Sequence, residues 1–299
     1  METNETPVVK IVKGRSYVAS LREGIKYPFL HFGEMCRFLW PVTLFLVILS
    51  IGVTLTELHL ILGYNRLPEL SVSRGLALVL LEFLSLSGTS LFMGHVLFQQ
   101  QQLTLQGVLP NVKPYRACGK LWKPALRFLF CGFIVKLLFN GVLALFALAL
   151  LRSWFLLLLP VALLLLCLLF LVPSFLEYLF TEASFLAAFK AGKWRYMGNT
   201  TIVLLLSLFA ASLVSAIGAL PLFSVIGIDV LVFQASLQGD VILLPTFFPC
   251  LRVVCIVLYT LVNTFALLLF FYPLLFHWGS TIAFEQERRA NDIAATSSH

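Results

Sequence analysis

Six apolar stretches in this chain are each long enough to cross a lipid bilayer. A spanning helix needs roughly 20 mostly apolar residues, because about 30 Å of hydrocarbon must be covered at 1.5 Å per residue. Runs such as Leu156–Leu171 are continuously apolar rather than alternating, which favours helices over the strands of a barrel. Only 12% of the residues are charged, about half the share in a soluble domain. We therefore predict an all-α integral membrane protein with six spans, at about 38–62, 74–98, 124–150, 153–179, 199–221 and 249–277.

The segments outside these spans are too short to form a separate soluble domain. Residues 1–15 are expected to be a mobile polar tail, residues 16–285 one membrane domain, and residues 286–299 a second polar tail. The first 26 residues lack the short apolar core and cleavage site of a signal peptide, so we expect the first span to be its own insertion signal. The connection 222–248 is expected to be an unusually apolar loop, and the sequence leaves open whether part of it is re-entrant.

Basic residues are distributed unequally between the two sides of the predicted spans. Sixteen Lys and Arg residues lie in the N-terminal flank, the second and fourth connections and the C-terminal tail, against four on the opposite side. Cytoplasmic flanks of spanning helices carry the excess of Lys and Arg, so both termini are predicted to be cytoplasmic. The net charge of +7 is then explained by anionic lipid headgroups at this face, and nucleic acid is not an expected partner.

The span map indicates an internal repeat of three helical hairpins, over about 16–98, 113–179 and 182–285. A basic segment that mixes apolar and charged residues precedes each hairpin, and we predict that it forms an amphipathic helix on the cytoplasmic membrane surface. The last helix is expected to continue past the bilayer through 285–289. Three such hairpins are able to close into a pseudo-threefold bundle.

The third of these basic segments contains Ser184, Phe185, Ala188 and Lys190, a match to the pattern S-F-x-x-A-x-K before a span. With the span pattern over most of the chain, it resembles a group of uncharacterised bacterial multi-pass membrane proteins. That group includes the membrane domain that precedes some glycerophosphodiester phosphodiesterases. The resemblance implies a bacterial inner (plasma) membrane. It does not extend to the phosphodiesterase domain, so it carries over no catalytic residue.

Two charged residues fall deep inside predicted spans. Glu82 and Lys136 both come out near the middle of the bilayer, where an unpaired charge costs roughly 2.5–3.5 kcal/mol on insertion scales. Lys136 and Asn140 share a helix face by their i, i+4 spacing, and Asn263 lies in the middle of the sixth span. We hypothesise an interior polar seam of Glu82, Lys136, Asn140 and Asn263. It is either structural, as an ion pair with interhelical hydrogen bonds, or part of a path for substrate or protons.

Other patterns indicate helix packing rather than chemistry. Ser90 with Gly94, and Ala211 with Ser215 and Ala219, are small residues spaced four apart, which permits close approach of helices. The chain has no HExxH, GxSxG or P-loop pattern, so we expect no catalytic residue, no metal and no cofactor.

Three function classes stay open on this sequence. A non-catalytic accessory or assembly subunit, with a protein partner or a second copy, is the principal expectation. A transporter or lipid-handling permease that uses the buried polar seam is the alternative, supported by the repeat and the intramembrane charges. An intramembrane enzyme would need a cluster of nucleophile, base or metal ligands, and the sequence does not assemble one.

Overall fold

Helices make up nearly all of the part of the chain that the computed structural model describes, which is residues 11–62, 72–106, 118–152, 162, 171–181, 184–190, 196–240 and 242–297. A helix over Leu171–Phe180 lies between α4 and α6 in the chain. The remaining helices are α1 (Tyr17–Leu30), α2 (Phe32–Leu62), α3 (Val72–Gln106), α4 (Cys118–Arg152), α6 (Phe185–Lys190), α7 (Met197–Leu237) and α8 (Phe248–Ser297).

Five of these helices contain segments long and apolar enough to cross a membrane. The segments lie in α2, α3, α4, α7 and α8, at Phe32–Leu60, Gly75–Gln100, Trp122–Val142, Met197–Leu237 and Phe248–Ile293. The predicted class, an all-α multi-pass membrane protein, is thereby confirmed. Most of the predicted span 153–179 lies outside the described residues. The three-hairpin repeat and the orientation of the termini stay predictions.

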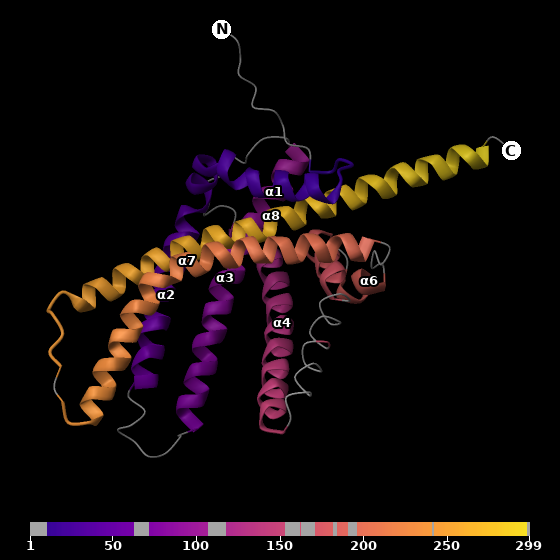
Figure 1. Cartoon of the computed structure of the whole chain (residues 1–299). Coiled ribbons are helices and arrows are strands. Elements are labelled where there is room, and N and C mark those ends of the chain that lie inside the picture. Colours follow the sequence, from indigo (N-terminus) through magenta and orange to yellow (C-terminus); the bar gives the residue numbers. More distant parts are fainter. Residues whose placement is uncertain are drawn as a thin grey trace, which may run out of the picture.

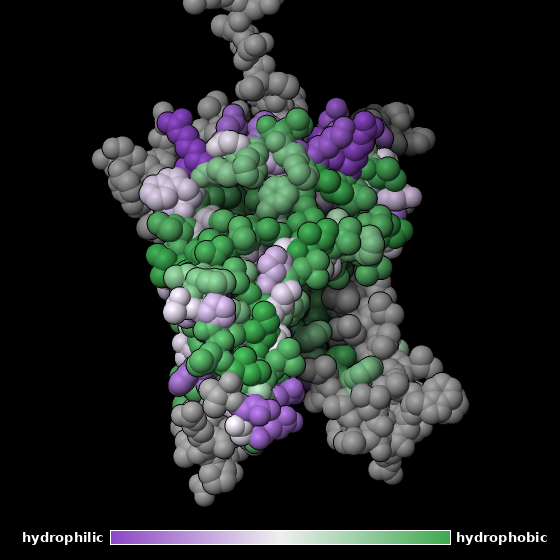
Figure 2. Space-filling model, turned by 60° about the vertical axis from the view of Figure 1, so that its left-hand side comes forward, coloured by the Kyte–Doolittle hydropathy of each residue, from purple (hydrophilic) through white to green (hydrophobic). Residues whose placement is uncertain are grey.

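The long helices pack in two groups that share α2 (Figure 1). Helices α2, α3 and α4 pack in chain order, while α7 and α8 lie side by side and α8 also contacts α1 and α2. One face of the molecule is apolar over most of its height, with hydrophilic residues gathered towards its upper and lower ends (Figure 2). Such a band is what a bilayer solvates, because its hydrocarbon is bounded on both sides by polar headgroups.

Helix α1 is held against the C-terminal half of α8 by a close backbone contact. A Cβ added to Gly24 would overlap the backbone of Pro273, so only glycine permits this approach. One turn earlier in α1, the hydroxyl oxygens of Ser20 and Ser280 lie 3.1 Å apart in a buried hydrogen bond. Residues 11–15, expected to belong to a mobile tail, also pack here: Ile11 is buried, and Arg15 Nε lies 2.5 Å from Glu23 Oε2.

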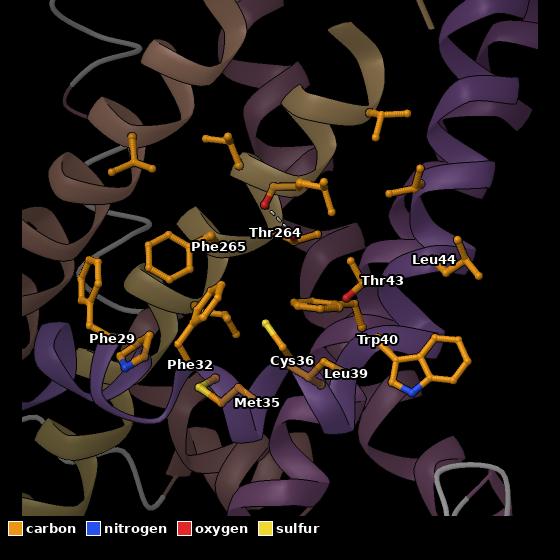
Figure 3. A pocket seen from close by; sticks show the side chains of 18 residues that line it. Phe29, Phe32, Met35, Cys36, Leu39, Trp40, Thr43, Leu44, Thr264 and Phe265 are labelled. Carbon is orange, nitrogen blue, oxygen red and sulfur yellow. Dashed lines mark hydrogen bonds between the residues drawn. The ribbon is translucent and has the colours of Figure 1, made fainter. Parts of the chain in front are cut away.

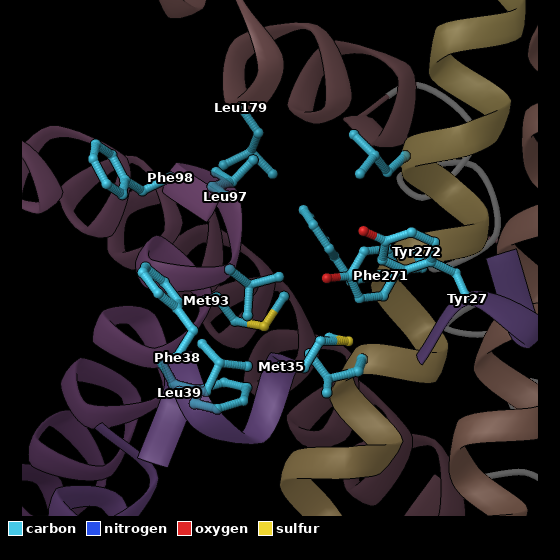
Figure 4. Packing of buried hydrophobic residues seen from close by; sticks show 14 of the residues in the cluster. Tyr27, Met35, Phe38, Leu39, Met93, Leu97, Phe98, Leu179, Phe271 and Tyr272 are labelled. Atoms are coloured by element: carbon cyan, nitrogen blue, oxygen red, sulfur yellow. The ribbon is translucent and has the colours of Figure 1, made fainter. Parts of the chain in front are cut away.

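The main apolar core lies where α1, α2, α3, α4, α8 and the Leu171–Phe180 helix converge (Figure 4). Its rings pack at tilted angles: the centroids of Tyr27 and Tyr272 are 4.7 Å apart, and those of Phe271 and Phe128 are 5.7 Å apart. Met35 and Met93 are buried among them. Apolar side chains fill this region, and the ion pairs between helices lie outside it.

Several helix boundaries differ from those predicted. The helix that carries the first span begins at Phe32 instead of residue 38, directly after His31 ends α1. The connection predicted at 99–123 is partly helical, because α3 continues to Gln106 and α4 begins at Cys118. Glutamine and lysine are good helix formers, so a spanning helix readily extends into water. At 181–198, only α6 and the start of α7 are described as helix.

The largest difference concerns the segment predicted as an apolar loop, 222–248. Helix α7 runs through Pro221 to Leu237 and only residues 238–247 connect it to α8. A proline inside a helix bends it without always ending it. Helix α7 changes direction along its length in Figure 1, while Leu222 and Val225 beyond Pro221 stay packed against α8. At the other end, α8 continues to Ser297, so residues predicted as the polar tail 286–299 are mostly helical.

Candidate functional site

Glu82 and Lys136, the two charges predicted inside spans, form an ion pair. Lys136 Nζ on α4 lies 2.6 Å from Glu82 Oε2 on α3, with side chains 35% and 51% exposed. The two helices meet at small residues: a Cβ added to Gly94 would stand 2.9 Å from Ala125 Cα, and one added to Gly132 would stand 2.9 Å from Leu86 Cδ1. Close helix approach therefore places the ammonium and the carboxylate within reach of each other.

A polar chamber of about 170 Å³ lies beside this pair, enclosed by α2, α3 and α8. It is large enough for several water molecules, each of which takes roughly 30 Å³ in liquid. Among the described residues that line it, Glu57 supplies the one carboxylate, and Glu57 is within electrostatic reach of both Glu82 and Lys136. The other polar side chains that line it are Ser50, Thr54, Ser85, Thr89, Tyr259, Thr260 and Asn263.

Two hydroxyl groups of this chamber, those of Thr89 and Thr260, offer oxygen lone pairs rather than protons. Thr89 donates its hydroxyl proton to Ser85 O at 3.0 Å, and Thr260 donates to Ile256 O at 2.8 Å. A hydroxyl that has donated still has an oxygen able to accept. Asn263 is fixed in position by a residue of α7, since its Oδ1 accepts a 3.0 Å hydrogen bond from Ser215 Oγ.

The structure divides the predicted polar seam. Glu82 and Lys136 are paired and Asn263 lines the chamber, whereas Asn140 is exposed on α4 and is not among the described residues that line it. Glu57 was not part of the predicted seam, because its place near the end of a span suggested ordinary contact with water. The signal for it was a polar stripe in an apolar helix, Ser50, Thr54 and Glu57, at spacings of four and three.

An open apolar groove of about 1090 Å³ lies on the other side of the contact between α2 and α8 (Figure 3). Phe29, Phe32, Cys36 and Trp40 line it from α1 and α2, and Phe265 lines it from α8. In Figure 3 the Cys36 sulfur points into the middle of the groove. Thr43 and Thr264 contribute the few polar atoms of the lining.

Two basic residues stand one helical turn from side chains that line this groove. Arg37 and Trp40 are i, i+3 on α2, and Lys26 and Phe29 are i, i+3 on α1, so each pair shares a helix face. Both basic residues are exposed. Lys26 and Arg37 therefore stand close to the lining of the groove near α1, while the lining itself is apolar.

The residues predicted to pack helices together lie at helix contacts. Ser90 is buried in α3, one turn before the contact of Gly94 with Ala125. Ala211 and Ala219 are buried in α7, and Ser215 between them makes the hydrogen bond to Asn263 on α8.

A second ion pair between helices joins α7 to α8. Arg252 Nη2 donates a hydrogen bond to Asp229 Oδ1, and the guanidinium carbon of Arg252 lies 5.5 Å from the centroid of the Phe248 ring. The Asp229 side chain is 5% exposed. Asp229 was predicted to lie in a loop outside the spans, and the continuation of α7 past Pro221 places it in a helix instead.

Metal ligands do not gather anywhere in the described part of the chain, where no three His, Cys, Asp or Glu residues stand close enough to share an ion. Cys36, Cys131, Cys250 and Cys255 are free thiols. The chain matches no family model, no curated protein and no solved structure. Chemistry and geometry alone must therefore support any statement about its function.

Proposed function

We propose that this protein handles lipid, and that it holds an anionic membrane lipid in the groove between α1, α2 and α8. The supporting observation is the groove itself, about 1090 Å³ of open and almost wholly apolar space with Lys26 and Arg37 near one end. An acyl chain suits the lining, because it removes apolar side chains from contact with polar groups. A lipid phosphate suits the two cations.

The proposed membrane is the bacterial inner membrane, with the basic end of the groove on the cytoplasmic side. The excess of Lys and Arg on one side of the spans supports this orientation. The resemblance carried by Ser184, Phe185, Ala188 and Lys190 supports the bacterial assignment.

Native mass spectrometry of the gently extracted full chain tests the proposal. The protein is reconstituted in vesicles of equal parts phosphatidylglycerol and phosphatidylethanolamine and then extracted again. We expect one retained phosphatidylglycerol per chain, and we expect Cys36→Trp, which places a bulky ring in the middle of the groove, to lose it. Leu213→Trp is the matched control, because Leu213 is 54% exposed on α7 and does not line the groove.

A double variant, Lys26→Gln with Arg37→Gln, separates the headgroup from the acyl chain. We expect it to retain both lipids equally, since the preference for the anionic headgroup is lost while the groove remains. Retention of phosphatidylglycerol by Cys36→Trp at the level of the unchanged protein would contradict the proposal.

An accessory or assembly subunit is the second candidate, and one observation favours it. Phe209, Leu213, Ile217 and Leu220 form a stripe along α7 in which every side chain is more than half exposed. Such a stripe suits a partner helix or a second copy of this chain as well as lipid. In the same mass spectra, a stoichiometric protein partner without retained lipid would favour this candidate over lipid handling.

A further inference from the structure

We propose that the chamber between α2, α3 and α8 is a binding site for one small monovalent cation, with Glu57 as its charged ligand. The chamber lies across the α2–α8 contact from the apolar groove, so the proposal does not depend on lipid handling. Three charged groups lie in or near the chamber, which are Glu57, Glu82 and Lys136.

Among the described residues, Glu57 is the one of these three groups that makes no direct ion pair, although Lys136 is within electrostatic reach of it. Lys136 is paired with Glu82 at 2.6 Å, which leaves this pair with no net charge. Within the described part of the chain, Glu57 makes neither a hydrogen bond nor an ion pair. An ionised carboxylate in a chamber between apolar helices is stabilised by a positive charge beside it, because the surrounding hydrocarbon solvates it poorly.

The walls of the chamber provide the remaining ligands. Hard cations are bound by carboxylate, carbonyl and hydroxyl oxygens. Thr89 and Thr260 have already donated their protons to their own helices and present oxygen lone pairs. Ser50 and Thr54 line the chamber from the same helix as Glu57. Water or an ion is also expected in a polar cavity of about 170 Å³, since buried polar groups without hydrogen-bond partners cost free energy.

The charge of the ligand follows from the same count. One carboxylate balances one positive charge, and no second unpaired acid lines the chamber among the described residues. A divalent ion would leave a net charge inside the membrane. The volume leaves room for water beside an ion as small as Na⁺.

Equilibrium binding of radioactive ²²Na⁺ to the purified full chain in detergent tests this site. We expect saturable binding of one Na⁺ per chain, displaced by unlabelled Na⁺ and not by choline. Glu57→Gln should lower the affinity for Na⁺ at least about tenfold, which corresponds to about 1.4 kcal/mol of binding free energy. Glu287→Gln is the matched control, because Glu287 is exposed on α8 and lies far along the chain from the chamber. This variant should bind Na⁺ as the unchanged protein does.

Two further variants keep the test decisive if Glu57→Gln does not fold. Thr54→Val and Thr260→Val preserve side-chain shape while removing a ligand oxygen, and each should weaken Na⁺ binding. Cys36→Trp should bind Na⁺ normally, because it fills only the groove. Absence of saturable binding to the unchanged protein, or equal binding by Glu57→Gln and the threonine variants, would overturn the assignment.

Discussion

Asp229 and Arg252 form an ion pair between α7 and α8 in which the carboxylate side chain is 5% exposed and the guanidinium side chain is 23% exposed. Removing the cation alone leaves a buried charge without a partner, which typically costs 3–5 kcal/mol. We expect Arg252→Met to lower the free energy of unfolding by about 3 kcal/mol, the lower end of that range, because the arginine is partly exposed. Denaturation in sodium dodecyl sulfate measures it.

The double variant Asp229→Asn with Arg252→Met should recover most of that loss, since neither charge then remains buried. Arg288→Ala is the control: Arg288 pairs with Asp292 at 3.9 Å near the end of α8, with both side chains exposed. Such surface pairs contribute about 0–1 kcal/mol. Equal losses in Arg252→Met and Arg288→Ala would refute a special role for the pair between α7 and α8.

The pair of Glu82 and Lys136 makes a prediction of non-additivity. Lys136→Leu leaves Glu82 without its cation and should destabilise the protein by roughly 2 kcal/mol, somewhat below the insertion cost of a charge, because Glu82 is half exposed. Glu82→Gln added to Lys136→Leu should restore most of the stability. A double-mutant cycle on unfolding free energies measures the coupling, and strictly additive effects would show that the contact contributes nothing.

Gly94 makes a prediction about helix packing. A Cβ added there would stand 2.9 Å from the Cα and N of Ala125, so Gly94→Ala must push α3 and α4 apart. We expect a loss of about 1–3 kcal/mol, as for other overpacked contacts. Gly75→Ala on the same helix meets nothing within 4 Å and should be neutral or stabilising by up to about 1 kcal/mol. Thermal unfolding of the two variants side by side decides it.

Tyr27 makes a prediction about alkaline pH. Burial in α1 raises the pKa of the Tyr27 phenol above its usual 10, with the charge of Glu34 adding to the effect. The unfolded chain therefore loses this proton first, and stability should fall as pH rises above about 10. Tyr27→Phe should reduce that fall, whereas Tyr17→Phe, at an exposed position, should not. Unfolding midpoints between pH 8 and pH 11 test the difference.

The sequence allowed the helical class and most spans to be predicted, because twenty apolar residues in a row have few alternatives to a spanning helix. It did not locate the ends of α3, α7 and α8, because glutamine, glutamate and even Pro221 continue a helix once packing supports it. The contact of Glu82 with Lys136 was foreseeable from their depths in neighbouring spans. The position of Glu57 was not, because its distance from both depends on how α2 rotates against α3.

The hydrogen bond between Ser20 and Ser280 joins positions 260 residues apart in the chain. At 5–20 residues per second, a ribosome needs roughly 13–50 s to make the intervening polypeptide. Throughout that interval α1 has no α8 to lie on, and the wall of the groove that α8 provides does not exist. The contact between α1 and α8 is therefore among the last to form as the chain is made. A chain released before Pro273 is synthesised would leave its amphipathic first helix on the membrane surface.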